Sequence, residues 1–252
     1  WTWLWENVAR MLRDQLGNPR RYQQALERLQ EGMSMEEQHE LRKQFYALFF
    51  ELAPAGQDYF KQSNTRLHFI AERVFLMTLE LYRDPKRLVG EISALGLRHV
   101  GYGIPTDLFG PFVTACTDVL GRHTQDKDSL EAYRWSLALI SRILVRTISE
   151  GSTVVMKAVN ANSTKQLKKA ISTAPRGKRA LWMLVVQVGT QSISPLSCAI
   201  ESGNLEVARA IIKDLLTIRA DRESYYYGAN ELFRRHPDIV KRLCQEAPML
   251  LP

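Results

Sequence analysis

The sequence predicts an all-α protein, and three observations support this fold class. Most apolar residues recur at spacings of three and four, which is the period of amphipathic helices. Glycine and proline are few, with 14 and 10 residues in a chain of 252, and long strand patterns of alternating apolar and polar residues are absent. Hydrophobic residues make up 45% of the chain, so it can fill one domain of ordinary size and a smaller one.

An amphipathic helix is predicted at the beginning of the chain. In residues 1–16 the apolar side chains fall on one stripe, and Asn18-Pro19 ends the pattern. We therefore expect residues 1–19 to form a docking helix in front of the main domain.

The next two helices carry signals for their ends. A second helix is predicted over residues 20–29, and Ser34 with Glu37 three residues later forms a capping box that opens the third. The third helix is expected to end near Ala53, because the residue before Pro54 disfavours helical dihedral angles.

Four further helices follow in the same main domain. A long one is predicted over residues 67–82, a shorter one leads to residue 99, and two long ones cover about 106–120 and 129–150. Gly151 is a candidate end for the last helix, although its apolar pattern continues to Val159.

Two tracts within residues 20–159 resemble landmarks of the globin family. Residues 44–50, followed by Pro54 and six residues later by Phe60, are similar to the second globin helix, its end and the phenylalanine that stacks on haem. The tract 95–105 is similar to the proximal helix and the corner after it, with His99 at the position of the iron ligand. The resemblance implies a globin-like domain over residues 20–159 with haem b as its cofactor. Haem needs an apolar crevice and a neutral imidazole, which the tracts supply.

The resemblance places Ile70 and Val74 on the distal side, where family members often have histidine or glutamine. His68 is the alternative as a second iron ligand, but turning it toward the iron also buries Glu72 without a partner, which is costly. Arg73 is expected at a haem propionate or the ligand, or alternatively in solvent.

Tyr46 stands where many microbial globins direct a phenol at the ligand. Its alternative role is that of an ordinary core tyrosine. The expected pocket consists of Tyr46, Phe60, Ile70, Arg73, Val74, Leu95, His99, Tyr102, Ile104, Phe109 and Phe112.

Residues 160–252 are expected to hold a basic linker and degenerate ankyrin-like repeats. The stretch 194–212 resembles an ankyrin repeat, a turn with two short antiparallel helices, and has Ser197 where the family has histidine. Aligning residues 206–209 with 238–241 gives an offset of 32, and residues 162–172 resemble part of an earlier repeat. The resemblance implies that this part contacts another protein.

The net charge of +7 is concentrated in the linker. No acidic residue occurs between Glu150 and Glu201, whereas seven basic residues do. This is either a patch for an acidic partner or a solvated linker, and we favour the linker. No aromatic residue interleaves with the charges before Trp182, so a nucleic-acid partner is not expected.

Three cysteines, Cys116, Cys198 and Cys244, lie far apart and form neither a zinc pattern nor a disulfide framework. With no leader pattern and no apolar run of about 18 residues, we expect a cytoplasmic protein without a transmembrane segment. Because the chain begins at Trp1 and stops within a helical pattern, we expect it to be part of a longer protein.

The sequence favours a haem protein that binds a diatomic gas, most of all oxygen, and acts as a gas or redox sensor coupled to the ankyrin-like part. The alternative is a haem-free globin-fold scaffold for protein interaction. Catalysis is not the favoured interpretation, because no flavin or nucleotide motif accompanies the helices, although a haem dioxygenase or peroxidase stays open.

Overall fold

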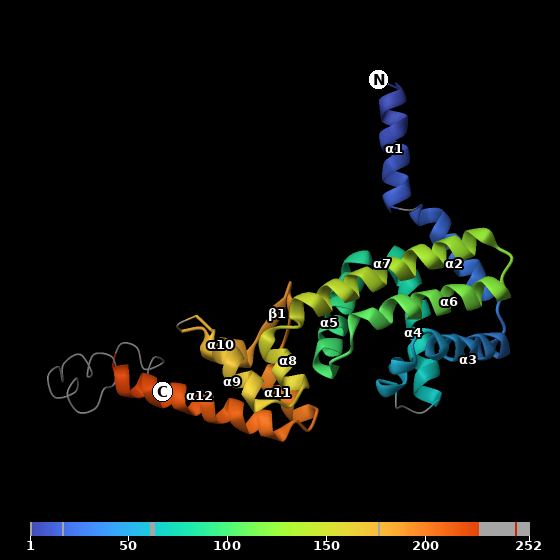
Figure 1. Ribbon diagram of the computed structural model, residues 1–252. Helices are drawn as coiled ribbons and strands as arrows, with labels where there is room; N and C mark the ends of the chain where they lie inside the picture. The colour runs from blue at the N-terminus through green and yellow to red at the C-terminus, as the bar shows by residue number, and fades with distance from the viewer. Residues whose placement is uncertain (1, 17, 61–63, 176, 227–244, 246–252) are drawn as a thin grey trace. The chain divides into compact units, whose positions relative to one another are not determined.

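A computed structural model describes residues 2–226 except 17, 61–63 and 176, together with residue 245 (Figure 1). The chain divides into two compact units. The first comprises the described residues of Trp1–Met156 together with Val186–Ile193, and the second those of Lys157–Val185 and Ser194–Pro252.

The first unit is a helical bundle. Its helices are α1 (Thr2–Leu16), α2 (Pro19–Glu31), α3 (Met35–Leu52), α4 (Asn64–Arg83), α5 (Pro85–Tyr102), α6 (Phe109–His123) and α7 (Lys127–Gly151), with short 3-10 helices η1 (Pro54–Asp58) and η2 (Thr106–Leu108). In Figure 1, α7 runs beside α2, α5 and α6, and these pairs are in contact, as are α3 and α6.

Several helix ends confirm the sequence signals. The capping box of Ser34 and Glu37 is present at the start of α3, and Ala53 is the residue that ends this helix. The proximal tract differs from expectation, because α5 continues past Gly101 to Tyr102. It ends at Gly103, whose φ of 68° lies in the left-handed region that glycine adopts without steric cost.

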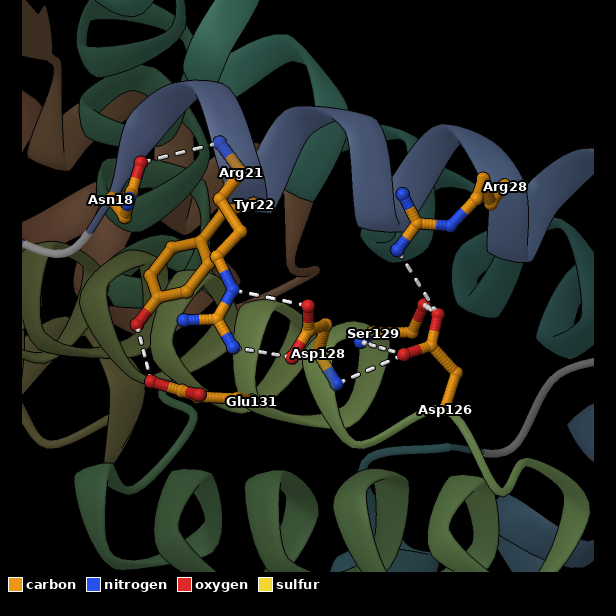
Figure 2. A network of polar contacts seen from close by, with 8 residues as sticks. All are labelled: Asn18, Arg21, Tyr22, Arg28, Asp126, Asp128, Ser129 and Glu131. Atoms are coloured by element: carbon orange, nitrogen blue, oxygen red, sulfur yellow. Dashed lines mark hydrogen bonds and ion pairs between the residues drawn. The ribbon is translucent and has the colours of Figure 1, made fainter.

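A polar network joins α2 to the beginning of α7 (Figure 2). Arg21 pairs with Asp128, Arg28 pairs with Asp126 at 3.2 Å, and the Tyr22 hydroxyl donates to Glu131 at 2.7 Å. The two ion pairs are exposed and contribute little to stability, on the order of 1 kcal/mol or less each. They fix the register of the two helices, while burial beneath them provides the stabilisation.

The interior of this unit contains two hydrophobic clusters. The larger one joins α2, α3, α4, α6 and α7, and includes Leu26, Phe49 and Tyr133, each at most 1% exposed. The second joins α4, α5 and α7 around Leu88 and Ile92. Burial of apolar side chains of this size is the main favourable contribution to folding.

The described chain is mostly helical, as predicted, and one further element of the first unit is a short β-hairpin. Strands β1 (Val186–Val188) and β2 (Gln191–Ile193) pair antiparallel across a two-residue loop. Val186 and Val188 are buried while Gln187 between them is exposed, which is the two-residue period of a strand. Three residues are too short a run for the pattern to be recognised in the sequence. The hairpin packs on α5 and α7.

The second unit consists of short helices and one long helix. The shorter ones are α9 (Thr164–Ser172), α10 (Arg179–Leu184) and α11 (Pro195–Glu201), and the long one is α12 (Leu205–Tyr226); α8 (Val154–Asn160) spans the boundary between the units. The sequence predicted two short helices over residues 194–212, and α12 is much longer than that. The stretch 238–241, aligned above as a further repeat, lies outside the described residues.

Among the described residues, no helix is long and apolar enough to cross a membrane.

Candidate functional site

Helix α5 carries His99 and is held close against α7. A Cβ atom added at Gly96 would lie 2.8 Å from the side chain of Thr147 on α7, so only glycine permits this approach. His99 lies one helical turn beyond Gly96 on α5. The close packing of the two helices therefore determines where the imidazole of His99 lies.

The His99 ring is oriented by the backbone. Its Nδ1 lies 2.8 Å from the carbonyl oxygen of Leu95, and since a carbonyl only accepts, Nδ1 is the donor. Burial lowers the pKa of His99 below its ordinary value and outweighs the opposing effect of this hydrogen bond. The ring is therefore neutral at pH 7, with the lone pair on Nε2, the form in which histidine binds metals.

Aromatic side chains from α3 form a cluster with two other phenylalanines. The ring of Tyr46 is 5.8 Å from that of Phe60, and Phe49 is 5.6 Å from Phe60 and 5.4 Å from Phe112 on α6. The structure thus brings together three of the predicted residues, Tyr46, Phe60 and Phe112, with Phe49 between them.

The Tyr46 hydroxyl donates to the carbonyl oxygen of Leu67 in α4 at 2.8 Å. Tyr46 is 6% exposed, and this burial raises the pKa of its phenol above the ordinary value. The hydroxyl is thus neutral, and it donates its hydrogen bond to the backbone of the first turns of α4.

The remaining apolar candidates belong to both hydrophobic clusters. Val74 and Ile104 pack against the larger cluster, whereas Leu95 and Phe109 pack against the smaller one. Phe109 also lies 5.7 Å from the ring of His99. The candidate residues are therefore divided between the two clusters, with Leu95 and Phe109 beside His99 and the others in the larger cluster.

His68 is placed against α3. Its ring stacks on His39 at 4.1 Å between centroids, and burial is the main cause that lowers the pKa of His68. Ile70, two residues further along α4, is partly buried. His68 thus contacts α3 through His39, and the assignment of Ile70 to the distal side stays a prediction.

Arg73 and Tyr102 lie apart from the aromatic residues. Arg73 bridges two carboxylates, Glu80 at 3.0 Å and Glu91 of α5 at 2.8 Å, and so connects α4 to α5. Tyr102 is 68% exposed at the end of α5.

Three contributors were not identified from the sequence. Gly96 was signalled only by a glycine inside a helical pattern, and Phe49 by its place in an aromatic run. Glu91 gave no signal, because its pairing with Arg73 depends on how two helices meet.

A small cavity of about 50 Å³ lies elsewhere in the unit. Its lining includes Phe45, Ala71, Phe75, Leu120 and Tyr133. None of the candidate residues lines it, so it is separate from the site described here.

The fold and the site together define a helical domain that presents a partly buried, neutral imidazole beside an aromatic and an aliphatic side chain. Residues 43–143 match the model of the Globin family, so the chain contains a globin domain over those residues. This stretch runs from α3 to α7 and includes Tyr46, Phe60 and His99. No curated protein and no solved structure matches the chain.

Proposed function

We propose that the globin domain binds haem b, with His99 as the proximal ligand, and takes up a diatomic gas, oxygen foremost. One observation carries the proposal: a partly buried imidazole is held neutral, with Nδ1 donating to the Leu95 carbonyl, which leaves the Nε2 lone pair available to a metal. Two observations support the apolar surroundings that haem needs: Leu95 and Phe109 lie beside His99, and Phe60, Val74, Ile104 and Phe112 belong to the larger hydrophobic cluster. When bound, haem would supply an iron centre able to take a diatomic ligand.

The chain's own residues have distinct proposed roles. Gly96 and Leu95 position the His99 ring, Ile70 and Val74 exclude water from the distal side, and the Tyr46 hydroxyl donates a hydrogen bond to the gas. For that bond the hydroxyl leaves the Leu67 carbonyl. Arg73 already pairs with Glu80 and Glu91, so it would hold a propionate only by exchanging one of these carboxylates for it.

The test is haem content. We expect purified wild-type protein to show a Soret band after reconstitution, and His99→Ala to lose stoichiometric haem, because imidazole donation is the strong protein bond to iron. His123→Ala, at an exposed position in α6, is the matched control and should keep the spectrum. Unchanged haem content in His99→Ala would refute the proximal assignment, and a wild-type protein that never takes up haem would favour the scaffold function.

We further propose that the second unit is an ankyrin-like module that binds another protein and responds to the state of the globin domain. Two observations support this. Helices α11 and α12 form a helical pair with Ser194 capping the first helix, and the β-hairpin that packs on α5 continues at both ends into the second unit. Movement of the helix that carries His99 would thus act on a segment covalently joined to the module.

A further inference from the structure

The basic stretch of the second unit contains a packed helix, so its charges lie on a folded surface. Helix α9 buries one side, where Leu167, Ala170 and Ile171 are 1%, 7% and 3% exposed. These positions recur at spacings of three and four, which define one side of a helix. Ser163 caps the helix by accepting a hydrogen bond from the N–H of Gln166 at 3.3 Å. The lysines of α9 are therefore presented from a helix that is packed on its other side.

The opposite side of α9 carries three exposed lysines, Lys165, Lys168 and Lys169, which we call the lysine stripe. Side chains three and four residues apart on a helix are neighbours, with Cβ atoms about 5–6 Å apart. Within the part of the chain that the structure describes, none of the three lysines forms an ion pair. The sequence supplies no acidic residue between Glu150 and Glu201 that could pair with them locally.

The lysine stripe is unfavourable for the helix that carries it. Lys165 precedes Lys168 by three residues and Lys169 by four, and like charges at these spacings repel each other. Lys165 also lies in the first turn, where the helix dipole disfavours a cation, and this turn contains no acidic residue. Helix α9 thus concentrates positive charge at a cost to its own stability, and an anionic partner would relieve both repulsions.

The exposed residues of α9 indicate which kind of anionic partner fits. All of them are polar: Lys165, Gln166, Lys168, Lys169 and Ser172. A helix that binds a membrane surface also inserts apolar side chains, and binding of single-stranded nucleic acid uses aromatic rings on which bases stack. Phosphate recognition favours the planar guanidinium of arginine, whereas lysine is a mobile, hydrated point charge. The surface therefore fits carboxylates of a polypeptide better than lipid or nucleic acid.

We propose that the lysine stripe binds an acidic segment of another protein, rich in glutamate or aspartate. An extended segment directs every second side chain to the same side, at intervals of about 6–7 Å. This interval is close to the spacing of about 5–6 Å between neighbouring lysines of the stripe. The inference rests on the proposed role of the second unit in binding another protein, and it names the surface and the chemistry of the partner.

The experiment is a titration of a labelled peptide, in which glutamate and serine alternate, with the full chain, followed by fluorescence anisotropy. We expect binding that weakens as the NaCl concentration rises, because salt screens exposed charges. The variant Lys165→Gln/Lys168→Gln/Lys169→Gln should bind about 10-fold more weakly, because three exposed ion pairs are lost. The same peptide with glutamine in place of glutamate should not bind.

A second triple variant is the matched control. It removes the same amount of positive charge at exposed positions in the first unit, Lys86→Gln, Lys127→Gln and Arg134→Gln. Its affinity for the acidic peptide should stay within about 2-fold of the wild type, because distant charges are screened. The stripe variant should unfold at a temperature no lower than the wild type in circular dichroism, since glutamine forms helices as well as lysine does and the repulsion is removed.

Four outcomes would overturn the proposal. The wild type does not bind the acidic peptide, the two triple variants lose the same affinity, or the stripe variant unfolds at a lower temperature, which would give the lysines a structural role. In the fourth outcome, the wild type but not the stripe variant sediments with vesicles that contain phosphatidylserine while the peptide stays unbound, which would assign the stripe to a membrane surface. Haem content tests the proposed gas binding separately, so the two failures are distinguishable.

Discussion

The hydroxyl of Tyr46 already makes a hydrogen bond within the fold. Its proposed role as a donor to the gas ligand requires that this bond be exchanged. The group is buried and neutral and donates to the Leu67 carbonyl. A hydrogen bond to a gas ligand must therefore compete with a backbone acceptor. In a low-dielectric pocket the bond to a ligand with partial negative charge contributes about 1.5–3 kcal/mol, which is enough to compete.

Tyr46→Phe tests this role at a single atom. The ring remains, so its contacts with Phe50 and Phe60 should persist. We expect the oxygen dissociation rate of the reconstituted protein to rise by about 10- to 100-fold, and that of carbon monoxide, a poorer acceptor, to change much less. Flash photolysis of both gases provides the measurement. Equal changes for both would indicate altered access, and no change for either would assign Tyr46 to packing alone.

His68 and Arg73 show that the contacts of a single side chain depend on the helix that packs beside it. In the sequence both were candidates for the pocket, yet His68 stacks on His39 and Arg73 lies between two carboxylates. Each partner is contributed by another helix or another turn. A charged or aromatic residue on an amphipathic helix thus has its role set by what faces it.

Helix α5 is the element on which the site depends most, and its packing on α7 is tight at one place. Gly96 is buried against Thr147, whereas Gly90 on the same helix has open space where a Cβ would stand. The two glycines therefore differ in function although both interrupt the same helical pattern.

Substituting each glycine with alanine separates these effects. Gly96→Ala should lower the free energy of unfolding by about 1–3 kcal/mol, because the added methyl group overlaps Thr147. Gly90→Ala should raise it by about 0.5–1 kcal/mol, because alanine is the better helix former. Urea unfolding followed by circular dichroism measures both. Similar effects of the two substitutions would contradict the close approach seen at Gly96.

At the scale of the whole molecule, the β-hairpin is a segment of the first unit that is connected to the second unit at both of its ends. It belongs to the first unit by its contacts with α5 and α7, yet the chain on both sides of it belongs to the second unit. Val188 of β1 lies near Gly151 at the end of α7. The hairpin is thus joined covalently to the second unit at both of its ends.

Hydrogen exchange tests whether the globin domain acts on the module. If the two are coupled, protection in residues 149–182 and in Val186–Ile193 should differ between the ferric, ferrous and gas-bound forms, because only states with different contacts shift an equilibrium. His99→Ala, which should lack haem, is the control and should show one pattern under all three conditions. Identical protection in the three wild-type forms would leave the hairpin as a passive connection.

The sequence by itself determined the parts of this protein that depend on local physics. It fixed the capping box at Ser34, the end of α3 before Pro54 and the amphipathic period of the bundle, since these follow from neighbouring residues along the chain. The assignment of His99 as the iron ligand came from the family resemblance, and it stays a prediction. Tertiary structure alone decided the rest: the approach permitted by Gly96, the pairing of Arg73 with Glu91 and the pairing of strands β1 and β2. These features depend on residues that lie far apart in the chain. Their interaction energies arise only when the helices pack together, so the spacing of residues along the sequence does not predict them.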